Sequence, residues 1–413
     1  MTGEPVVAEP PRLEADRVRR AMFAVYVVFF ASGFAFASWA SRIPQVRDRL
    51  HVDPGELGLI LLAMAAGSVI AMPLSGMVIT RFGMARSVAT MSVVLVVGMV
   101  AVAIGYLHGV PATVVGLFLF GLGNGIWDVG MNVQGAAVEQ QLGRAIMPRF
   151  HAGWSIGTFT GALAGSLMVA VHVPVTAHLL VVAGLVAVSV PVAVRAFIPA
   201  APHPAPAAGE RRRHPLEAWT EPRTLIVGVF VLCLAFTEGT GNDWLGVAMI
   251  DGYHTAPALG SLTFALFVGA MTTGRWFGPG LIDRHGRVPM LRGSALLALI
   301  GLVLVVFSGT VATAMIGAVL WGLGTALGFP VGMSAAADDP LHAAARVSVV
   351  ASIGYTAFLG GPPLVGFLGD HFGVRHGLTA VAAILAVAVL IAKALHPLAS
   401  SEPATSLEPA AKR

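Results

Sequence analysis

Three polar residues stand at regular spacing inside one long apolar stretch of the chain. Asn124, Asp128 and Asn132 are four residues apart within GLGNGIWDVGMNVQGAAVE, residues 121–139. On a helix, positions i, i+4 and i+8 lie on one face, so these side chains form a polar stripe. A carboxylate in the middle of a membrane helix costs about 2.5–3.5 kcal/mol on insertion scales, and such residues face a cavity or a partner. The stripe predicts a cavity in which Asp128 binds a proton; alternatively, the two asparagines only hydrogen-bond neighbouring helices.

Glu238 and Arg275 are two further charged residues in apolar stretches. Glu238 is a second candidate for a protonatable cavity residue, or one member of a static salt bridge. Arg275 is a cation that needs a partner inside a membrane. It could bind an anionic group of a substrate, balance Asp128 or Glu238, or brace the cytoplasmic gate. Aromatic residues that could stack on a sugar ring in this cavity, or only pack, are Trp39, Trp154 and Tyr355.

The stretch EGTGNDW, residues 238–244, places two glycines near acidic residues late in an apolar segment. Because glycine makes the backbone easier to bend, this stretch predicts a gate at the outer mouth of the cavity. Asp243 and Trp244 belong to this gate. Arg42 stands at the outer end of the first apolar segment, so we expect an ion pair between Arg42 and Asp243.

The composition is that of a polytopic helical membrane protein. The 413 residues are 56 % hydrophobic and 11 % charged, whereas about 25 % of residues are charged in soluble proteins. The net charge of +4 is expected to come from basic loops at the membrane surface, not from nucleic-acid binding. A single cysteine, Cys233, excludes an intrachain disulfide and a cysteine metal cluster, and we expect no metal site. The expected partners are the lipid bilayer and a small-molecule substrate, with a functional monomer.

Twelve apolar segments follow one another along the chain. Most approach or exceed the roughly 20 residues that span a hydrocarbon core. Helices are expected throughout, because lipid cannot satisfy unpaired backbone groups. The segments cover residues 22–40, 57–79, 88–107, 112–133, 153–171, 177–197, 225–244, 258–281, 290–307, 311–333, 350–368 and 378–394.

A linker with several prolines and three consecutive arginines separates the sixth segment from the seventh. It divides the chain into two halves of six segments each. The predicted parts are an N-terminal tail at 1–20, a six-helix bundle at 21–197, the linker at 198–223, a second six-helix bundle at 224–395 and a C-terminal tail at 396–413.

Lysine and arginine residues concentrate on the side of the membrane that holds both tails and the linker. The opposite side has only Arg42, Arg47, Arg49 and Arg375, and Arg275 lies within the membrane. Short cytoplasmic loops carry the excess of basic residues in membrane proteins. We therefore expect a multi-pass protein of the plasma or inner membrane with both termini in the cytoplasm.

The two halves resemble each other at a separation of about 200 residues. GLGNGIWDVGMN from Gly121 matches GLGTALGFPVGMS from Gly322, and WSIGTFTGALAG from Trp154 matches ASIGYTAFLGGPPLVG from Ala351. Parallel six-helix repeats place a binding site at their interface near the bilayer midplane. Asp128 has no acidic counterpart in the second copy, so the acid is not explained by the repeated fold.

Four glycines repeat at four-residue spacing in the fifth apolar segment, at Gly153, Gly157, Gly161 and Gly165. Small residues at this spacing let a neighbouring helix approach closely. We expect this segment to pack tightly against another helix.

Two loops in corresponding places of the halves share a glycine turn followed by basic residues. The first reads GMVITRFGMAR over residues 76–86, and the second reads LIDRHGR over residues 281–287. We expect the carboxylate of Asp283 to interact with a helix N-terminus or with an arginine across the interface between the halves. The residues of the motif are Gly76, Arg81, Gly83 and Arg86 in the first loop and Asp283, Arg284, Gly286 and Arg287 in the second.

This pattern resembles the signature loop of the major facilitator superfamily, G-x-L-x-D-R-x-G-R. The resemblance extends over the whole chain and implies an all-α membrane fold of twelve transmembrane helices in two pseudo-symmetric six-helix bundles. It also implies secondary active transport by alternating access, with an ion gradient and no cofactor. The chain departs from the signature at Thr80, which replaces the aspartate of the first loop, and at Pro279, which replaces the leading glycine of the second.

Residues 38–76 and the run DVGMN, residues 128–132, look similar to a bacterial branch near the fucose permease-like sugar–proton symporters. In those symporters an acidic residue and an asparagine four positions later lie on the fourth helix. The resemblance implies that Asp128 and Asn132 handle a proton and a sugar-like solute or other small polar metabolite. A proton-coupled drug or metabolite exporter is the alternative.

Other classes of function find little support. The only lysines, Lys393 and Lys412, lie in no phosphate-binding loop, so the sequence does not predict an ATP-driven pump. No nucleophile and base stand at a suggestive spacing, so we do not expect an enzyme. A non-transporting membrane sensor is a remote alternative, because both tails and the linker are short.

Overall fold

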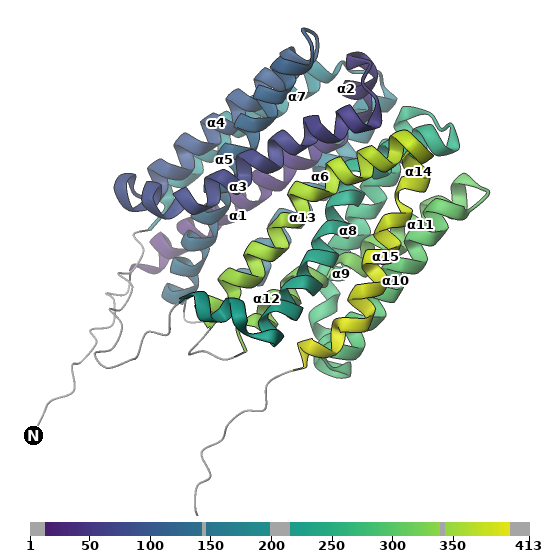
Figure 1. Ribbon diagram of the computed structural model, residues 1–413. Helices are drawn as coiled ribbons and strands as arrows, with labels where there is room; N and C mark the ends of the chain where they lie inside the picture. The colour runs from purple at the N-terminus through teal and green to yellow at the C-terminus, as the bar shows by residue number, and fades with distance from the viewer. Residues whose placement is uncertain (1–12, 143–145, 199–214, 339–342, 397–413) are drawn as a thin grey trace, which may run out of the picture.

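The computed structural model describes residues 13–142, 146–198, 215–338 and 343–396. All regular elements within these ranges are helices, which confirms the predicted all-α class. They form two bundles that lie side by side, one from each half of the chain (Figure 1).

The N-terminal bundle contains six long helices, which correspond to the first six apolar segments. A short helix, α2, connects the first two of them at the end of the molecule remote from the chain termini (Figure 1). The elements are α1 (Ala15–Ala40), α2 (Ile43–Leu50), α3 (Pro54–Phe82), α4 (Met84–Gly105), α5 (Val110–Leu142), α6 (Met147–Ala170), α7 (Val175–Ala193) and the 3-10 turn η1 (Val194–Ala196).

The C-terminal bundle repeats this plan, except that the segment predicted as a single helix at 311–333 is divided into two helices. The segment predicted at 378–394 is one α-helix that ends in a 3-10 turn, like the sixth segment of the N-terminal bundle. The elements are η2 (Pro215–Thr220), α8 (Pro222–Tyr253), α9 (Pro257–His285), α10 (Arg287–Phe307), α11 (Val311–Thr325), α12 (Gly328–Ala336), α13 (Ala343–Phe372), α14 (Val374–Gly377), α15 (Thr379–Ile391) and η3 (Ala392–Leu395).

Eleven helical spans in the described ranges are long and apolar enough to cross a membrane. The helix α6, which has 24 residues, corresponds to the remaining predicted segment and packs against α1 and α9. Several helices extend beyond the apolar segments that predicted them, most clearly α8 and α5. In the additional part of α5, Gln134, which is fully buried, donates to the Ile198 carbonyl over 3.0 Å and accepts from the Ile198 amide over 2.9 Å.

Glycine turns join α3 to α4 and α9 to α10, as the loop motif predicts. Gly83 has a φ of 78° and Gly286 a φ of 85°, in the region that side chains other than glycine rarely adopt. The junction between α13 and α14 has the same geometry at Gly373, with a φ of 78°. Each turn lets the chain reverse direction within a few residues.

The glycines of α6 bring this helix close to α1. A Cβ atom at Gly161 would lie 2.6 Å from the carbonyl oxygen of Phe34 on α1, which is too short for any side chain. The predicted tight packing of this segment is therefore found between the first and fifth membrane helices.

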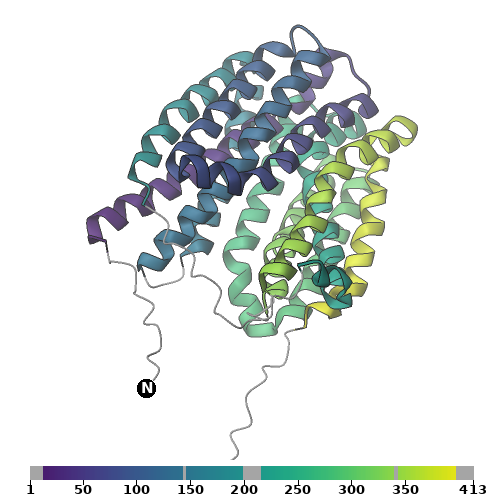
Figure 2. The same ribbon diagram turned by 60° about the vertical axis from the view of Figure 1, so that its left-hand side comes forward.

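The two bundles touch at the end of the molecule remote from the start of α1 and the end of η3, which we call the distal end (Figure 2). There α3 packs on α13 and α6 packs on α9. Among the residues that the structure describes, no hydrogen bond or ion pair joins the bundles at the opposite, terminal end. Polar contacts that join them at the distal end are the ion pair of Arg47 with Asp251, Gly55 N to Asp370 Oδ1 over 3.0 Å, Ser261 Oγ to Ser41 O over 3.1 Å, and Ser166 Oγ to Ala258 O over 3.3 Å.

Candidate functional site

The polar stripe lies on α5 as predicted. Asn124, Asp128 and Asn132 are all half-buried, whereas Trp127 between them is fully buried in the N-terminal bundle. Asp128 is close enough to Tyr355 on α13 to interact with it electrostatically, so this face of α5 is turned toward the other bundle.

Asp128 stands out because its carboxylate has neither a hydrogen bond nor an ion pair with any described residue. The other two members of the stripe do have partners. Ser32 Oγ donates to Asn124 Oδ1 over 3.3 Å, and Asn132 Nδ2 donates to the backbone carbonyl of Asp128 over 2.8 Å. Asn124 thus bonds a neighbouring helix, as the alternative interpretation expected, whereas Asn132 bonds the backbone of its own helix and the acid has neither kind of contact.

Glu238 and Arg275 form an ion pair between α8 and α9. One guanidinium nitrogen, Nη2, lies 2.8 Å from both carboxylate oxygens, and the side chains are only 11 % and 20 % exposed. Of the partners considered for Arg275, the structure selects Glu238. The pair neutralises both charges at this depth of the C-terminal bundle.

A break in the helical chain supplies a second partner for Arg275. Its Nε donates to the carbonyl oxygen of Ala326 over 3.4 Å. Ala326 lies between α11 and α12, four residues before Pro330, and proline has no N–H with which to bond that carbonyl. The carbonyl is therefore free to accept from the arginine. Pro330 stands in the stretch that the repeat aligns with Asp128, so the two halves differ here in chemistry.

Arg275 also reaches the N-terminal bundle. Its guanidinium lies 5.5 Å from the ring centre of Trp154 on α6, and it interacts electrostatically with the exposed His151 one turn away. Close by, Thr272 Oγ1 donates to the Ser155 carbonyl over 3.2 Å. The contact of Arg275 with Trp154 therefore lies between the bundles, at the level where the closed distal region ends.

The candidate site thus combines side chains from five of the helices that line the interface. From the sequence, Trp154 is predicted only as a possible stacking residue, and its contact with Arg275 is not predicted. A signal was present, because Trp154 opens the repeated stretch whose second copy contains Tyr355. The residues brought together are Asn124 and Asp128 on α5, His151 and Trp154 on α6, Glu238 on α8, Arg275 on α9 and Tyr355 on α13.

The expected ion pair between Arg42 and Asp243 is wrong. Arg42 lies at the junction of α1 and α2, is only 2 % exposed and points into its own bundle. Its Nε donates to His178 Nδ1 over 3.0 Å, and its Nη2 donates to the Val173 carbonyl over 3.0 Å. The geometry of the helix junction sets this direction, and spacing along the sequence does not reveal it.

Arg47 makes the cross-bundle ion pair at the distal end that we had expected of Arg42. It binds Asp251 at the end of α8 and also its neighbour Asp48, which lies 2.7 Å from Nη2. From the sequence, Arg47 is predicted only as a charge in a loop. Two predicted gate or cavity residues, Trp39 and Trp244, are 2 % and 0 % exposed and lie in the packed core in this conformation, so their roles stay predictions.

The signature loops make fewer contacts between the bundles than expected. Arg287 binds both carboxylate oxygens of Asp338 over 2.9 Å, and Arg223 binds the same carboxylate over 2.7 Å. Asp283 is exposed and has no hydrogen bond or ion pair with a described residue, so the expected partner across the interface is not in reach. The bundles are separated at this end. Exposed members of the motif are Gly76, Arg81, Gly83, Arg86, Asp283, Arg284 and Gly286.

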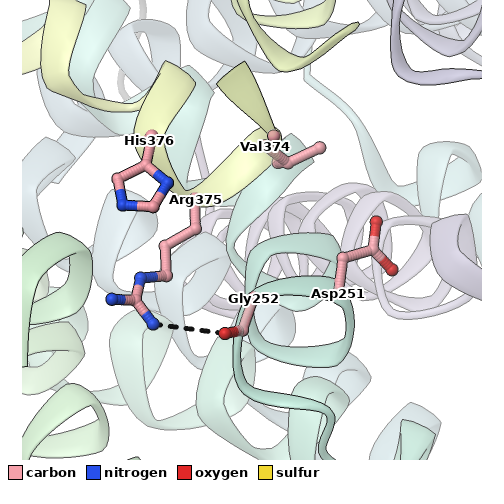
Figure 3. Close-up of a pocket in the computed structure, with 6 residues that line it drawn as sticks. Asp251, Gly252, Val374, Arg375 and His376 are labelled. Atoms are coloured by element: carbon pink, nitrogen blue, oxygen red, sulfur yellow. Dashed lines mark hydrogen bonds between the residues drawn. The ribbon is translucent and has the colours of Figure 1, made fainter. Parts of the chain in front are cut away.

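A cavity of about 280 Å³ lies at the distal surface, away from the stripe (Figure 3). Arg375 lines it and donates to the Gly252 carbonyl over 3.2 Å and to the Val306 carbonyl over 2.7 Å. Its guanidinium stacks on Tyr253 at 4.5 Å. These contacts fix α14 to α8 and α10, so this cavity is part of the outer rim of the C-terminal bundle.

Comparison with known proteins identifies the family. The model of the Major Facilitator Superfamily matches residues 22–355 and, in a second match, residues 229–412. The chain belongs to the major facilitator superfamily. This superfamily protein is therefore a multi-pass transport protein of the cell membrane and not an enzyme. Its partners are the lipid bilayer and a small-molecule substrate.

Its relatives include two uncharacterised transporters and a membrane protein. It is 28 % identical to an uncharacterised MFS-type transporter of Yersinia pestis, over 87 % of this chain and 91 % of the relative. It is 30 % identical to an uncharacterised transporter of Sinorhizobium fredii, over 83 % and 89 % of the two chains. Membrane protein MosC of Rhizobium meliloti is 29 % identical over 87 % and 86 %.

Solved structures confirm the predicted major facilitator fold. The nucleoside transporter NupG superposes with a TM-score of 0.72 at 14 % identity, over 91 % of this chain and 98 % of that one. The fucose:proton symporter FucP of E. coli gives 0.63 at 14 % identity over the same shares. A bacterial homologue of the lysosomal transporter Spinster gives 0.73 at 10 % identity, over 93 % and 98 %.

Proposed function

We propose that this protein is a proton-coupled secondary transporter of a small polar solute, and that Asp128 is its proton-binding residue. The observation that carries the proposal is the unpaired carboxylate of Asp128, which is half-buried on α5 and faces the other bundle. A carboxylate held at this depth without a cation is poorly solvated when charged, so it gains from binding a proton.

The chemistry around Asp128 favours an uncharged polar solute with a ring, such as a sugar, or another small metabolite. Asn124 and Asn132 offer amides, and Trp154 and Tyr355 offer aromatic faces. Arg275 is already ion-paired with Glu238. Among the described residues, the site therefore has no free cation that could bind a carboxylate or phosphate group of a solute. The structurally similar proteins FucP, a fucose:proton symporter, and NupG, a nucleoside transporter, agree with a solute of this kind.

The positions of the contacts between the bundles support alternating access. The bundles are joined at the distal end by Arg47 with Asp251 and by Gly55 with Asp370, and the described part of the chain forms no such contacts at the terminal end. If both termini lie in the cytoplasm, as the distribution of basic residues predicts, this conformation is closed to the outside and open to the inside.

The experiment is transport into proteoliposomes that contain the purified full-length protein. A panel of radiolabelled sugars and nucleosides is offered with an imposed pH gradient of either sign, which also separates import from export. We expect one solute to accumulate only with the gradient. We expect Asp128→Asn to abolish that accumulation but to retain exchange of labelled for unlabelled solute, because exchange needs no net proton movement.

A matched control is Asp16→Asn, which changes an exposed aspartate at the start of α1 and should leave accumulation unchanged. Accumulation by Asp128→Asn at the level of the wild type would contradict the coupling role of Asp128. If a drug accumulates only when the gradient favours outward movement, the protein is a proton-coupled exporter and the proposal is wrong.

A further inference from the structure

Asp243 is a second acid inside the membrane that lacks a partner. It is half-buried on α8, and its carboxylate has no hydrogen bond or ion pair with any described residue. The expected cation, Arg42, is bound to His178 instead. Of the three acids that lie deep in the spanning helices, only Glu238 is paired, and its partner Arg275 is fully engaged.

The two unpaired acids lie in different bundles and at different depths. At 1.5 Å per residue, Asp243 lies about 15 Å from the distal end of α8 and Asp128 about 27 Å from the distal end of α5. The Glu238 and Arg275 pair, with Trp154 beside it, lies between these two levels. Asp243 is thus on the closed, distal side of that pair, and Asp128 is near the level at which the contacts between the bundles end.

No free cation is offered to Asp243 by the neighbouring helices. The helices α11, α12 and α15 pack on α8 and contain no titratable residue. Apart from Tyr355, which interacts electrostatically with Asp128, the titratable groups on the other elements packed against α8 lie at its two ends or are themselves bound. The titratable groups on these elements are Arg47, Asp48 and Arg49 on α2, Arg275, Asp283, Arg284 and His285 on α9, Arg346, Tyr355, Asp370 and His371 on α13, Arg375 and His376 on α14, Glu217 on η2 and Lys393 on η3.

Other polar atoms near Asp243 are also without partners. Thr240 Oγ1, Asn242 Oδ1 and Trp244 Nε1 are buried and form no hydrogen bond with a described residue. Thr240 is three residues before Asp243 and therefore shares its side of the helix. Buried polar atoms that the protein leaves unpaired are commonly satisfied by water. Thr240 and Asp243 therefore place two polar side chains without described partners on one side of α8.

We propose that Asp243 is a second proton-binding residue of the transport cycle, reached by protons from the distal side. The inference rests on the proton coupling proposed above. Asp243 takes a proton from water when the distal end opens and returns it to water in the reverse step, so charge and atoms balance without a redox partner. Each bundle then contributes one exchanging carboxylate, and the ion pair of Glu238 with Arg275 lies between them.

The test uses protons as the probe and needs no known solute. Infrared difference spectra of the full-length protein in lipid nanodiscs are recorded between neutral and mildly acidic buffer. The C=O stretching band of protonated carboxylic acids should contain two components in the wild type. Asp243→Asn should remove one and Asp128→Asn the other, whereas Asp16→Asn, which changes an exposed residue outside the interface, should remove neither.

Each outcome decides between the two proposals. An unchanged band in Asp243→Asn, or a wild type with only the component of Asp128, overturns the role of Asp243 and leaves the proposed function intact. A wild type with neither component overturns proton binding at both residues. Asp243→Glu guards against misfolding, because it keeps a carboxyl group and should move the second component to a new frequency without abolishing it.

Discussion

At the scale of the residue, Arg275 shows how one side chain is fixed by neighbours from both bundles. It donates to both oxygens of the Glu238 carboxylate and to the carbonyl oxygen of Ala326, and it lies over the ring of Trp154. A cation at this depth is tolerated only because its charge is matched. The same pair leaves Asp128 without a cation, which is the condition for binding and releasing a proton.

The coupling between Glu238 and Arg275 can be measured by a double-mutant cycle. We expect Glu238→Gln and Arg275→Gln each to lower the free energy of unfolding by about 3 kcal/mol, because each leaves a largely buried charge without a partner. The double variant should lose less than the sum, with a coupling energy of about 1–3 kcal/mol. Denaturant unfolding in detergent micelles gives these values, and additive losses would show that the pair contributes nothing.

At the scale of the element, the break between α11 and α12 has a chemical cause and a consequence for the site. Pro330 removes one helical hydrogen bond and frees the Ala326 carbonyl for Arg275. The sequence contained this signal, but hydropathy alone joined residues 311–333 into one segment. The ends of α5 and α8 were also predicted too short, because the polar residues of their last turns are held by packing, which hydropathy does not report.

Replacing Pro330 should therefore separate stability from transport. Pro330→Ala restores the N–H, so the Ala326 carbonyl can bond within a continuous helix and no longer needs Arg275. We expect unchanged or higher stability, by up to about 3 kcal/mol, together with a lower transport rate. Thermal melting and proteoliposome uptake measure the two effects. A variant that transports as fast as the wild type would show that the break has no functional role.

A second prediction at this scale concerns the packing of α1 on α6. Gly161→Val would place atoms against the backbone carbonyl of Phe34, which cannot move aside, so we expect a loss of about 1–3 kcal/mol or failure to fold. Gly184→Ala on α7 is the matched control, since no atom lies within 4 Å of its Cβ position. The yield of monodisperse protein and its melting temperature report the result. Equal behaviour of the two variants would contradict the packing argument.

At the scale of the whole molecule, the contacts between bundles define one state of a two-state system. The fold class, the twelve spans and the repeated halves were predictable, because hydropathy and repetition are local properties of the sequence. The surroundings of Arg42 and Asp283 could not be predicted in this way. The direction of Arg42 depends on the turn between α1 and α2, and the environment of Asp283 depends on which end of the molecule is open.

Weakening the distal contacts should shift the population toward opening at that end. Asp251→Asn removes the cross-bundle partner of Arg47. The side chains of Arg47 and Asp251 are 11 % and 37 % exposed, so we expect the free-energy difference between the closed and open distal end to change by about 0.5–1 kcal/mol. The population with an open distal end should then rise two- to fivefold. An impermeant thiol reagent reports this as faster labelling of Ser41→Cys, a buried position, in a Cys233→Ser background. Asp48→Asn is the control on the same arginine. Equal labelling in both variants would show that Asp251 does not hold the distal end closed.

The bond between Gln134 and Ile198 has a consequence for how the chain could be divided. Ile198 is the last described residue before the linker, and its amide and carbonyl are both held by a side chain of α5. On the other side, Glu221 at the start of α8 is bound by Arg346 of α13 over 2.6 Å. Each bundle therefore secures its own end of the linker. Two co-expressed fragments, residues 1–206 and 207–413, should therefore assemble into a working transporter without a covalent connection between them.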